Sequence, residues 1–258
     1  TFTGKERDKE SGYDYFGARS YWALLMHWLS VDPLAHKYPW LSPYAYCNWN
    51  PVTHKDPNGK NPVYSIDGEL LGTDETGLRG AAIVMNKESF TQNMSSDDAM
   101  RLDMGTESLS KKAFQKYYNN YTNLSSRPDW DGIITLSEAN NWYRNGNGEP
   151  LFVDAAKIDL SPLEKSDFST VGSSKYVNFL DPKKLNLQTG LVYGTILVTL
   201  MNNDGAVKLG NNSGLLDVYN FDMQQGRPYR NFATQLGSII AGNGTSFNIY
   251  HYGQGKVK

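Results

Sequence analysis

One turn signal, Asp56-Pro57-Asn58-Gly59, constrains the organisation of this chain more than any other feature. Aspartate at the first position, proline at the second and glycine at the fourth are the residues that a type I turn favours. Tyrosine, tryptophan and three of the four histidines are concentrated before this turn, and the composition changes after it. From about residue 62 onward, helical and extended patterns alternate. We therefore predict two units, residues 1–60 and residues 61–258.

The composition allows a globular protein and excludes several classes. Of the 258 residues, 39% are hydrophobic and 20% are charged, which is enough to build a core. The net charge of -2 gives no overall attraction to DNA or to an anionic membrane, so no nucleic-acid partner is expected. A single cysteine, Cys47, excludes a disulfide framework and a zinc site built from several thiolates. The longest apolar run, residues 191–201, contains Tyr, Gly and Thr and is too short and too polar to predict a membrane span.

Residues 1–60 carry a series of short motifs whose order and spacing are specific. The motifs are Thr3-Gly4-Lys5-Glu6-Arg7-Asp8, Tyr15-Phe16-Gly17-Ala18-Arg19, Leu29-Ser30-Val31-Asp32-Pro33-Leu34-Ala35, Lys37-Tyr38-Pro39, Ser42-Pro43-Tyr44-Ala45-Tyr46, Asn50-Pro51 and Asp56-Pro57-Asn58-Gly59-Lys60. Together they resemble the conserved core at the end of bacterial RHS and YD-repeat proteins, which precedes their variable C-terminal regions. The resemblance covers about the first quarter of the chain.

The resemblance implies a role in competition between bacteria. RHS proteins build a shell of repeats around a C-terminal toxin or effector, so the expected partners are the RHS shell of the parent chain and an immunity protein. The expected location is secreted or at the cell surface. The repeats and an initiator Met are missing here, and we expect this sequence to be a piece of a larger protein.

In some members of the family, a pair of aspartates releases the C-terminal region by self-cleavage. The matching positions are Asp32 and Asp56. Two carboxylates must approach to about 3 Å to share a proton, and the missing shell is what would hold the two loops together. We favour the simpler reading, that both are turn residues before proline, and predict that this fragment does not cut itself.

The pattern of residues 61–258 predicts an α+β fold with a helical N-terminal half. Ser110 is the expected N-cap of an amphipathic helix over 110–122, in which Phe114, Tyr117, Tyr118 and Tyr121 form one face, and we expect its tyrosines in the core. Further helices are expected from Ser137 to a stop at Gly146-Asn147-Gly148, and through Phe232, Leu236 and Ile239 or Ile240 to Gly242. Strands are expected over 191–200, 206–209 and 247–252, the first two joined by the turn Asn202-Asn203-Asp204-Gly205.

Between the first two predicted helices, the stretch that begins at Arg127 has the length and spacing of an EF-hand loop. Asp129, Asp131, the backbone carbonyl of Ile133 and Glu138 stand at ligand positions, which predicts calcium or magnesium as a cofactor. The first ligand position holds Arg127, which cannot donate a lone pair to a metal. The alternative is that Arg127 pairs with Asp129 or Glu138 and leaves a metal-free helix-turn-helix.

Residues 61–258 contain one histidine, His251, and no cysteine. This excludes catalysis by a multi-histidine zinc site or by a Cys-His pair within that unit. By alternation along a strand, His251 shares a face with Phe247 and Ile249, and we expect it to be packed rather than catalytic.

The densest polar stretch, residues 217–231, supplies the candidate catalytic residues Asp217, Tyr219, Asp222, Arg227 and Arg230. Two guanidinium groups can clamp phosphoryl oxygens while a carboxylate holds a metal or orients water. This chemistry predicts a metal-assisted hydrolase of a phosphoester or pyrophosphate. The alternative is a turn held by Asp–Arg ion pairs, in a non-enzymatic binding or structural domain.

A second resemblance concerns the last ~50 residues. The order Asp217, Tyr219, Arg227, followed by a helix and a Gly-rich turn into the last strand, is similar to the catalytic region of colicin M-type bacteriocins. That resemblance implies hydrolysis of the lipid-linked peptidoglycan precursor. The chain departs from the family at Asn220, where a second Asp is expected, and at Gly226, where the catalytic His is expected.

Overall fold

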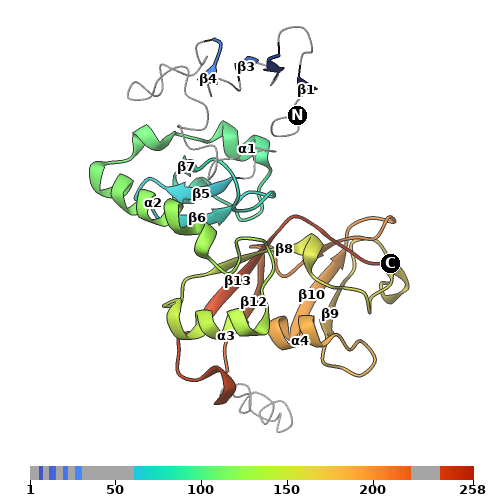
Figure 1. Ribbon diagram of the computed structural model, residues 1–258. Coiled ribbons are helices and arrows are strands. Elements are labelled where there is room, and N and C mark those ends of the chain that lie inside the picture. Colours follow the sequence, from blue (N-terminus) through green and yellow to red (C-terminus); the bar gives the residue numbers. More distant parts are fainter. Residues whose placement is uncertain (1–5, 8–11, 16–19, 23–26, 31–60, 222–238) are drawn as a thin grey trace.

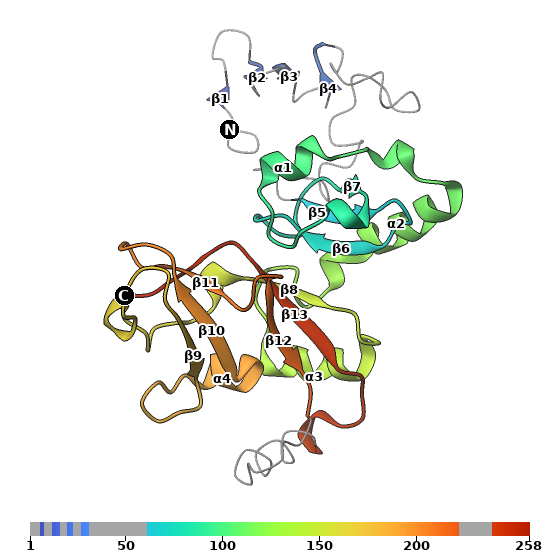
Figure 2. The same ribbon diagram turned by 180° about the vertical axis from the view of Figure 1, so that it is seen from behind.

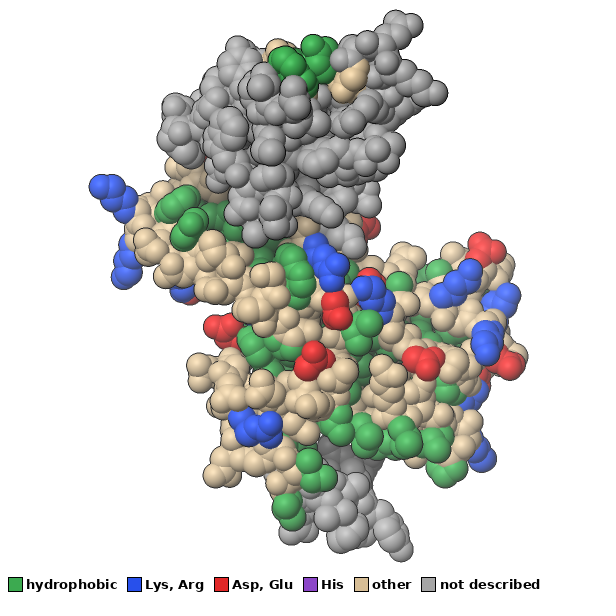
Figure 3. Space-filling view, in the orientation of Figure 1, with side chains coloured by type: hydrophobic (Ala, Val, Ile, Leu, Met, Phe, Trp, Pro, Cys, Tyr) green, Lys and Arg blue, Asp and Glu red, His purple; other side chains and the backbone are tan. Residues whose placement is uncertain are grey.

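The computed structural model describes residues 6–7, 12–15, 20–22, 27–30, 61–221 and 239–258 (Figure 1). Helices and strands alternate through these residues, so the expected α+β class is confirmed. Residues 62–126 form a first lobe, and residues 127–221 with 239–258 form a second lobe beneath it in Figures 1 and 3. No helix of the described residues is long and apolar enough to cross a bilayer.

The first lobe is a three-stranded sheet between two helices. Its elements are β5 (Pro62–Ser65), β6 (Leu70–Thr73), β7 (Ile83–Met85), α1 (Ser96–Arg101) and α2 (Lys111–Asn123), and the strand order is β6-β5-β7. Because successive strand residues point to opposite faces, Val63 packs toward Ala99 of α1 while its neighbour Tyr64 packs toward Tyr117 of α2. The expectation that the N-terminal half is helical was therefore wrong at residues 62–85, where short hydrophobic runs form strands.

The second lobe encloses the largest core between two sheets and two helices. One sheet has the order β14-β11-β10-β9 and the other β12-β13-β8, and Figures 1 and 2 show α3 and α4 across their lower ends. The bounds are α3 (Leu136–Asn145), β8 (Leu151–Asp154), β9 (Ser174–Asn178), α4 (Leu187–Tyr193), β10 (Thr195–Leu200), β11 (Ala206–Leu209), β12 (Leu215–Tyr219), β13 (Phe247–Tyr252) and β14 (Gly255–Lys256). Apolar residues from every strand but β14 fill this core.

Strand β13 connects the two lobes. It pairs antiparallel with β12 and parallel with β8. At its end, the Gln92 side chain of the first lobe donates to the His251 carbonyl at 3.0 Å, and Gly253 N donates to the Asn93 side chain at 2.7 Å. Because these bonds cross between lobes, the end of β13 has a fixed position against both.

Two of the predicted helices are confirmed. The Ser110 side chain accepts a hydrogen bond from Ala113 N at the start of α2, as an N-cap does. Helix α3 begins one residue before the expected Ser137 and ends at Gly146. The expectation that the tyrosines of α2 are in the core was wrong for Tyr118, which is 51% exposed. Phe114, on the same face, is 41% exposed.

The strand predictions are confirmed for the hairpin β10–β11 and for β13. The first part of the predicted strand 191–200 was wrong, because residues 191–193 belong to α4. Gly194 ends that helix with a φ of 62°, a conformation that side-chain-bearing residues avoid, and β10 begins at Thr195. Of the helix expected before Gly242, only residues 239–241 are described, and they are helical.

Before residue 61, the described residues form four short antiparallel strands in the order β1-β2-β3-β4. They are β1 (Glu6–Arg7), β2 (Asp14–Tyr15), β3 (Ser20–Trp22) and β4 (His27–Trp28). Most residues of the RHS-like motifs, with Asp32 and Asp56, lie outside the described residues. The prediction that the fragment does not cut itself stays a prediction.

Candidate functional site

Asp217 lies half-buried in β12, opposite Ile249 of β13. The pairing of the two strands is irregular between Leu215 and Asp217, and such a bulge re-aims the side chains next to it. Asp217 and Tyr219 are two residues apart after this irregularity, and alternation along a strand places them on the same face of the sheet. A half-buried carboxylate thus lies in β12 a short distance in sequence before residue 222.

Tyr219 is held inside the core of the second lobe. Its ring stacks on Phe247 with centroids 5.1 Å apart, and its hydroxyl donates to Asn140 Oδ1 of α3 at 2.7 Å. Burial raises the pKa of Tyr219 to about 12, so the phenol stays protonated near neutral pH. In this position Tyr219 fixes α3 against β12, and a catalytic role for it stays a prediction.

The other three candidate catalytic residues, Asp222, Arg227 and Arg230, lie outside the described residues. Their convergence with Asp217 stays a prediction. Strand β12 ends at Tyr219, so residues 217–219 of the polar stretch belong to a strand.

The predicted ion-binding loop is organised around a buried ion pair. Arg127 Nε and Nη2 donate to the two oxygens of Asp129, each at 2.9 Å, and both side chains are almost completely buried. Arg127 Nη2 also donates to the Pro150 carbonyl at 2.6 Å, and Phe152 N donates to Asp129 Oδ2 at 2.8 Å. The pairing of Arg127 with Asp129 is the alternative that the sequence offered.

The residues of this loop do not fit the full ligand set of an EF-hand. Both Asp129 oxygens are engaged inside the core, and Glu138 Oε2 accepts from Thr135 N and Oγ1 as part of a capping box. Of the predicted metal ligands, this leaves Asp131, the Ile133 carbonyl and the second oxygen of Glu138. Over the described ranges, no group of three or more His, Cys, Asp or Glu side chains is arranged to hold a metal. The binding of calcium or magnesium here stays a prediction.

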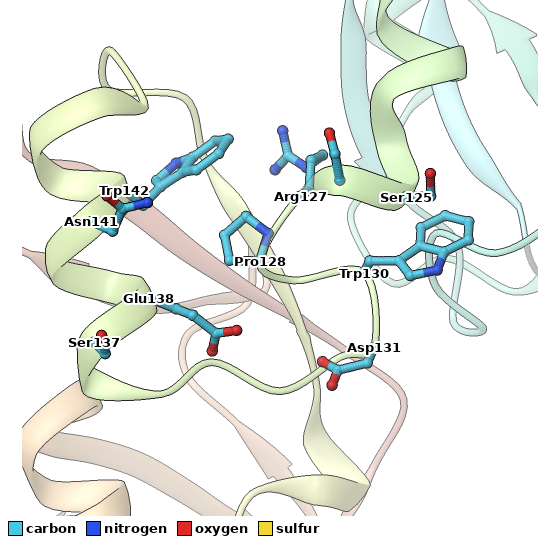
Figure 4. A pocket seen from close by; sticks show the side chains of 10 residues that line it. Ser125, Arg127, Pro128, Trp130, Asp131, Ser137, Glu138, Asn141 and Trp142 are labelled. Carbon is cyan, nitrogen blue, oxygen red and sulfur yellow. The ribbon is translucent and has the colours of Figure 1, made fainter.

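Beside this loop lies an open hollow of about 520 Å³, which we call the α3 hollow (Figure 4). One wall is formed by the loop residues Ser125, Ser126, Arg127, Pro128, Trp130 and Asp131. The other wall is one face of α3 and is formed by Ser137, Glu138, Asn141 and Trp142. Figure 4 shows the Asp131 and Glu138 carboxylates pointing toward each other from the two walls.

Sequence reasoning found the two carboxylates of the α3 hollow but missed Trp130, Asn141 and Trp142. The available signal was helical spacing, because Ser137 and Asn141 are four residues apart, as are Glu138 and Trp142, and so share a face of α3. What the spacing could not show is which segment faces that side of the helix.

His251 is fully buried, as expected of a packed histidine. Neither ring nitrogen makes a hydrogen bond of normal geometry, although the backbones of Leu209 and Gly253 lie near the ring. Burial lowers the pKa of His251 to about 4, so the ring is neutral at physiological pH. The side chain is part of the core and is not available to a substrate.

The comparisons with known proteins include a likeness to a solved structure. No family model matches the sequence, and no curated protein matches it. Among solved structures, the chain is similar to the truncated bacteriocin syringacin M from Pseudomonas syringae pv. tomato DC3000. The identity is 19% and the TM-score 0.25, over 58% of this chain and 74% of that one. We take no functional argument from a likeness at this level.

Proposed function

We propose that residues 61–258 are the toxin-like effector module of an RHS-type protein that is secreted or displayed at the cell surface. The support is the series of motifs in residues 1–60, which resembles the segment that precedes such effectors. A cluster of apolar side chains from residues 134–257 is buried in one core, as a folded effector requires. The RHS shell of the parent chain and an immunity protein are the proposed partners.

We further propose that this module hydrolyses a phosphoester or pyrophosphate. The observation that carries the proposal is the position of Asp217, a half-buried carboxylate set in a strand between apolar neighbours. Partial burial strengthens the interaction of a carboxylate with a metal ion or with the water that attacks phosphorus. Asp222, Arg227 and Arg230 follow within fourteen residues of Asp217, and the guanidinium groups would neutralise the phosphoryl oxygens.

A second candidate function is non-enzymatic binding. The observation that favours it is the α3 hollow, which combines indole rings with exposed polar groups and lies beside a loop held by a buried ion pair. Such a site can recognise a ligand without reacting with it.

The two functions are separated by toxicity in a test bacterium. The full chain is produced either in the cytoplasm or, behind a signal peptide, in the periplasm, and growth is followed. We expect growth arrest from the wild type and its loss in Asp217→Asn and Arg227→Ala. Asp204→Asn, in an exposed turn, and Arg101→Ala, in an exposed ion pair, are the matched controls and should stay toxic.

Three results would contradict the hydrolase. Variants that fold, by circular dichroism, and arrest growth as the wild type does would remove Asp217 and Arg227 from the site. Loss of toxicity in the controls as well would show that the effect is not specific. A wild type harmless in both compartments would favour the binding function.

A further inference from the structure

We propose that the α3 hollow is a binding site for a short neutral saccharide. Its volume of about 520 Å³ falls within the roughly 300–1,000 Å³ typical of small-molecule sites. This inference does not depend on the proposed hydrolase, because it concerns other residues.

The walls of the hollow are held in place by bonds that do not involve a ligand. Arg127 is fixed by its buried pair with Asp129. The Trp142 indole N–H donates to the Glu149 carbonyl at 2.8 Å, and Arg79 Nε donates to the Trp130 carbonyl at 2.8 Å. A preformed site binds its ligand without the loss of conformational freedom that ordering a loop would require.

The polar groups of the hollow select a ligand that is rich in hydrogen-bond donors. Glu138 uses Oε2 in the capping box, and Asp131 uses Oδ1 to accept from Ile133 N. Among the described residues, the second oxygen of each carboxylate makes no hydrogen bond or ion pair, and Figure 4 shows both groups facing the space between the walls. Ionised carboxylates only accept hydrogen bonds, so the ligand must donate. The two carboxylates disfavour an anion, and the Lys157 ammonium, which donates to the Asp131 backbone carbonyl, offsets only part of their charge.

The indole rings favour a neutral ligand over a cationic one. The Arg127 guanidinium lies 5.0 Å from the centre of the Trp142 ring, and that of Arg79 lies 5.6 Å from the centre of the Trp130 ring. A cationic ligand at either ring would be repelled by the arginine guanidinium that already lies over that ring. A sugar ring offers an uncharged C–H surface for the Trp142 indole and hydroxyl donors for the carboxylates, whereas Figure 4 shows the Trp130 ring pointing away from the space between the walls. The exposed amide of Asn141 can both donate to and accept from the same hydroxyls.

The test is a titration of the full chain with saccharides, in which binding is followed by the NMR signals of the indole N–H groups of Trp130 and Trp142. The probes are cellotriose and the N-acetylglucosamine trimer, which are neutral, and the glucosamine trimer, which is cationic. We expect the neutral trisaccharides to shift the Trp142 signal more than the Trp130 signal, because Figure 4 shows only the Trp142 ring beside the space between the walls. The affinity should change little with salt concentration. Glu138→Gln should weaken binding by at least about threefold, because it removes a charged acceptor. Gln can still serve in the capping box.

Asn141→Ala should weaken binding by a similar factor, and its matched control is Asn119→Ala on the exposed face of α2, which should bind as the wild type does. Three outcomes would overturn the proposal. The first is no shift with either neutral probe up to about 50 mM, beyond which binding has no meaningful strength. The second is unchanged affinity in both hollow variants. The third is tighter binding of the glucosamine trimer that falls steeply with salt, which would assign the hollow to cations.

Discussion

Lowering the pH from 7.5 to 5.0 is expected to destabilise the protein through His251. The imidazole is fully buried and its pKa in the folded state is about 4, against about 6.5 when the chain is unfolded. Below pH 6.5 the unfolded state binds a proton that the folded state does not. Stability is therefore complete above pH 6.5 and is lost as the pH falls toward 4.

The magnitude follows from the two pKa values. At pH 5.0 the unfolded histidine is almost fully protonated and the folded one about one-tenth protonated, which corresponds to about 2 kcal/mol of lost unfolding free energy. The positive charge of Lys208 on β11 adds to the effect of burial and also lowers the pKa of His251. Carboxylates with lowered pKa values, such as Asp167, contribute mainly at lower pH.

The assay is urea unfolding of the full chain, followed by tryptophan fluorescence, at both pH values and for the wild type and His251→Phe. Phe fills a similar volume and does not titrate. Whatever the substitution does at pH 7.5, the wild type should lose about 2 kcal/mol more than the variant between the two pH values. Equal losses would refute the reasoning, as would an NMR titration that places the folded pKa of His251 above 6.

Three further predictions concern contacts within the second lobe. Arg127→Ala should lower the unfolding free energy by about 3–5 kcal/mol, because it leaves Asp129 buried without its counter-ion; a loss below about 1 kcal/mol, measured by urea unfolding, would contradict this. Tyr219→Phe should lower it by about 1–2 kcal/mol, because buried Asn140 loses its donor; no change in the thermal midpoint would count against the bond. Thr135→Ala should lower it by about 1 kcal/mol through loss of the cap of α3, whereas Thr135→Ser should keep most of it.

Local signals explain the parts of the fold that the sequence predicted well. Helix α2 has a serine cap and a regular aromatic spacing, and α3 ends at a glycine, so each carries its own start or stop signal. The hairpin β10–β11 is closed by a turn in which Gly205 N donates to the Asn202 carbonyl, and asparagine and glycine are residues that turns favour. These features depend on residues close together in the chain.

The parts that were missed depend on residues far apart. Strand β8 forms by parallel pairing with β13, and no local sequence signal near Leu151 predicts pairing with Ile249, which lies far along the chain. The run from Leu191 to Tyr193 reads as a strand, but packing against β12 and the break at Gly194 place it in α4. The Arg127–Asp129 pair was one of two arrangements that the loop allowed, because charge alone could not tell an internal counter-ion from a metal ion.

The parallel pairing of β8 with β13 has a consequence for how the chain reaches its native state. Loop-closure entropy must be lost before such a distant contact forms, and this slows folding. While the chain is being synthesised, Leu151, Phe152 and Val153 leave the ribosome long before the strand that will cover them. Until then, this apolar segment lacks the strand that pairs with it and is open to association with other chains.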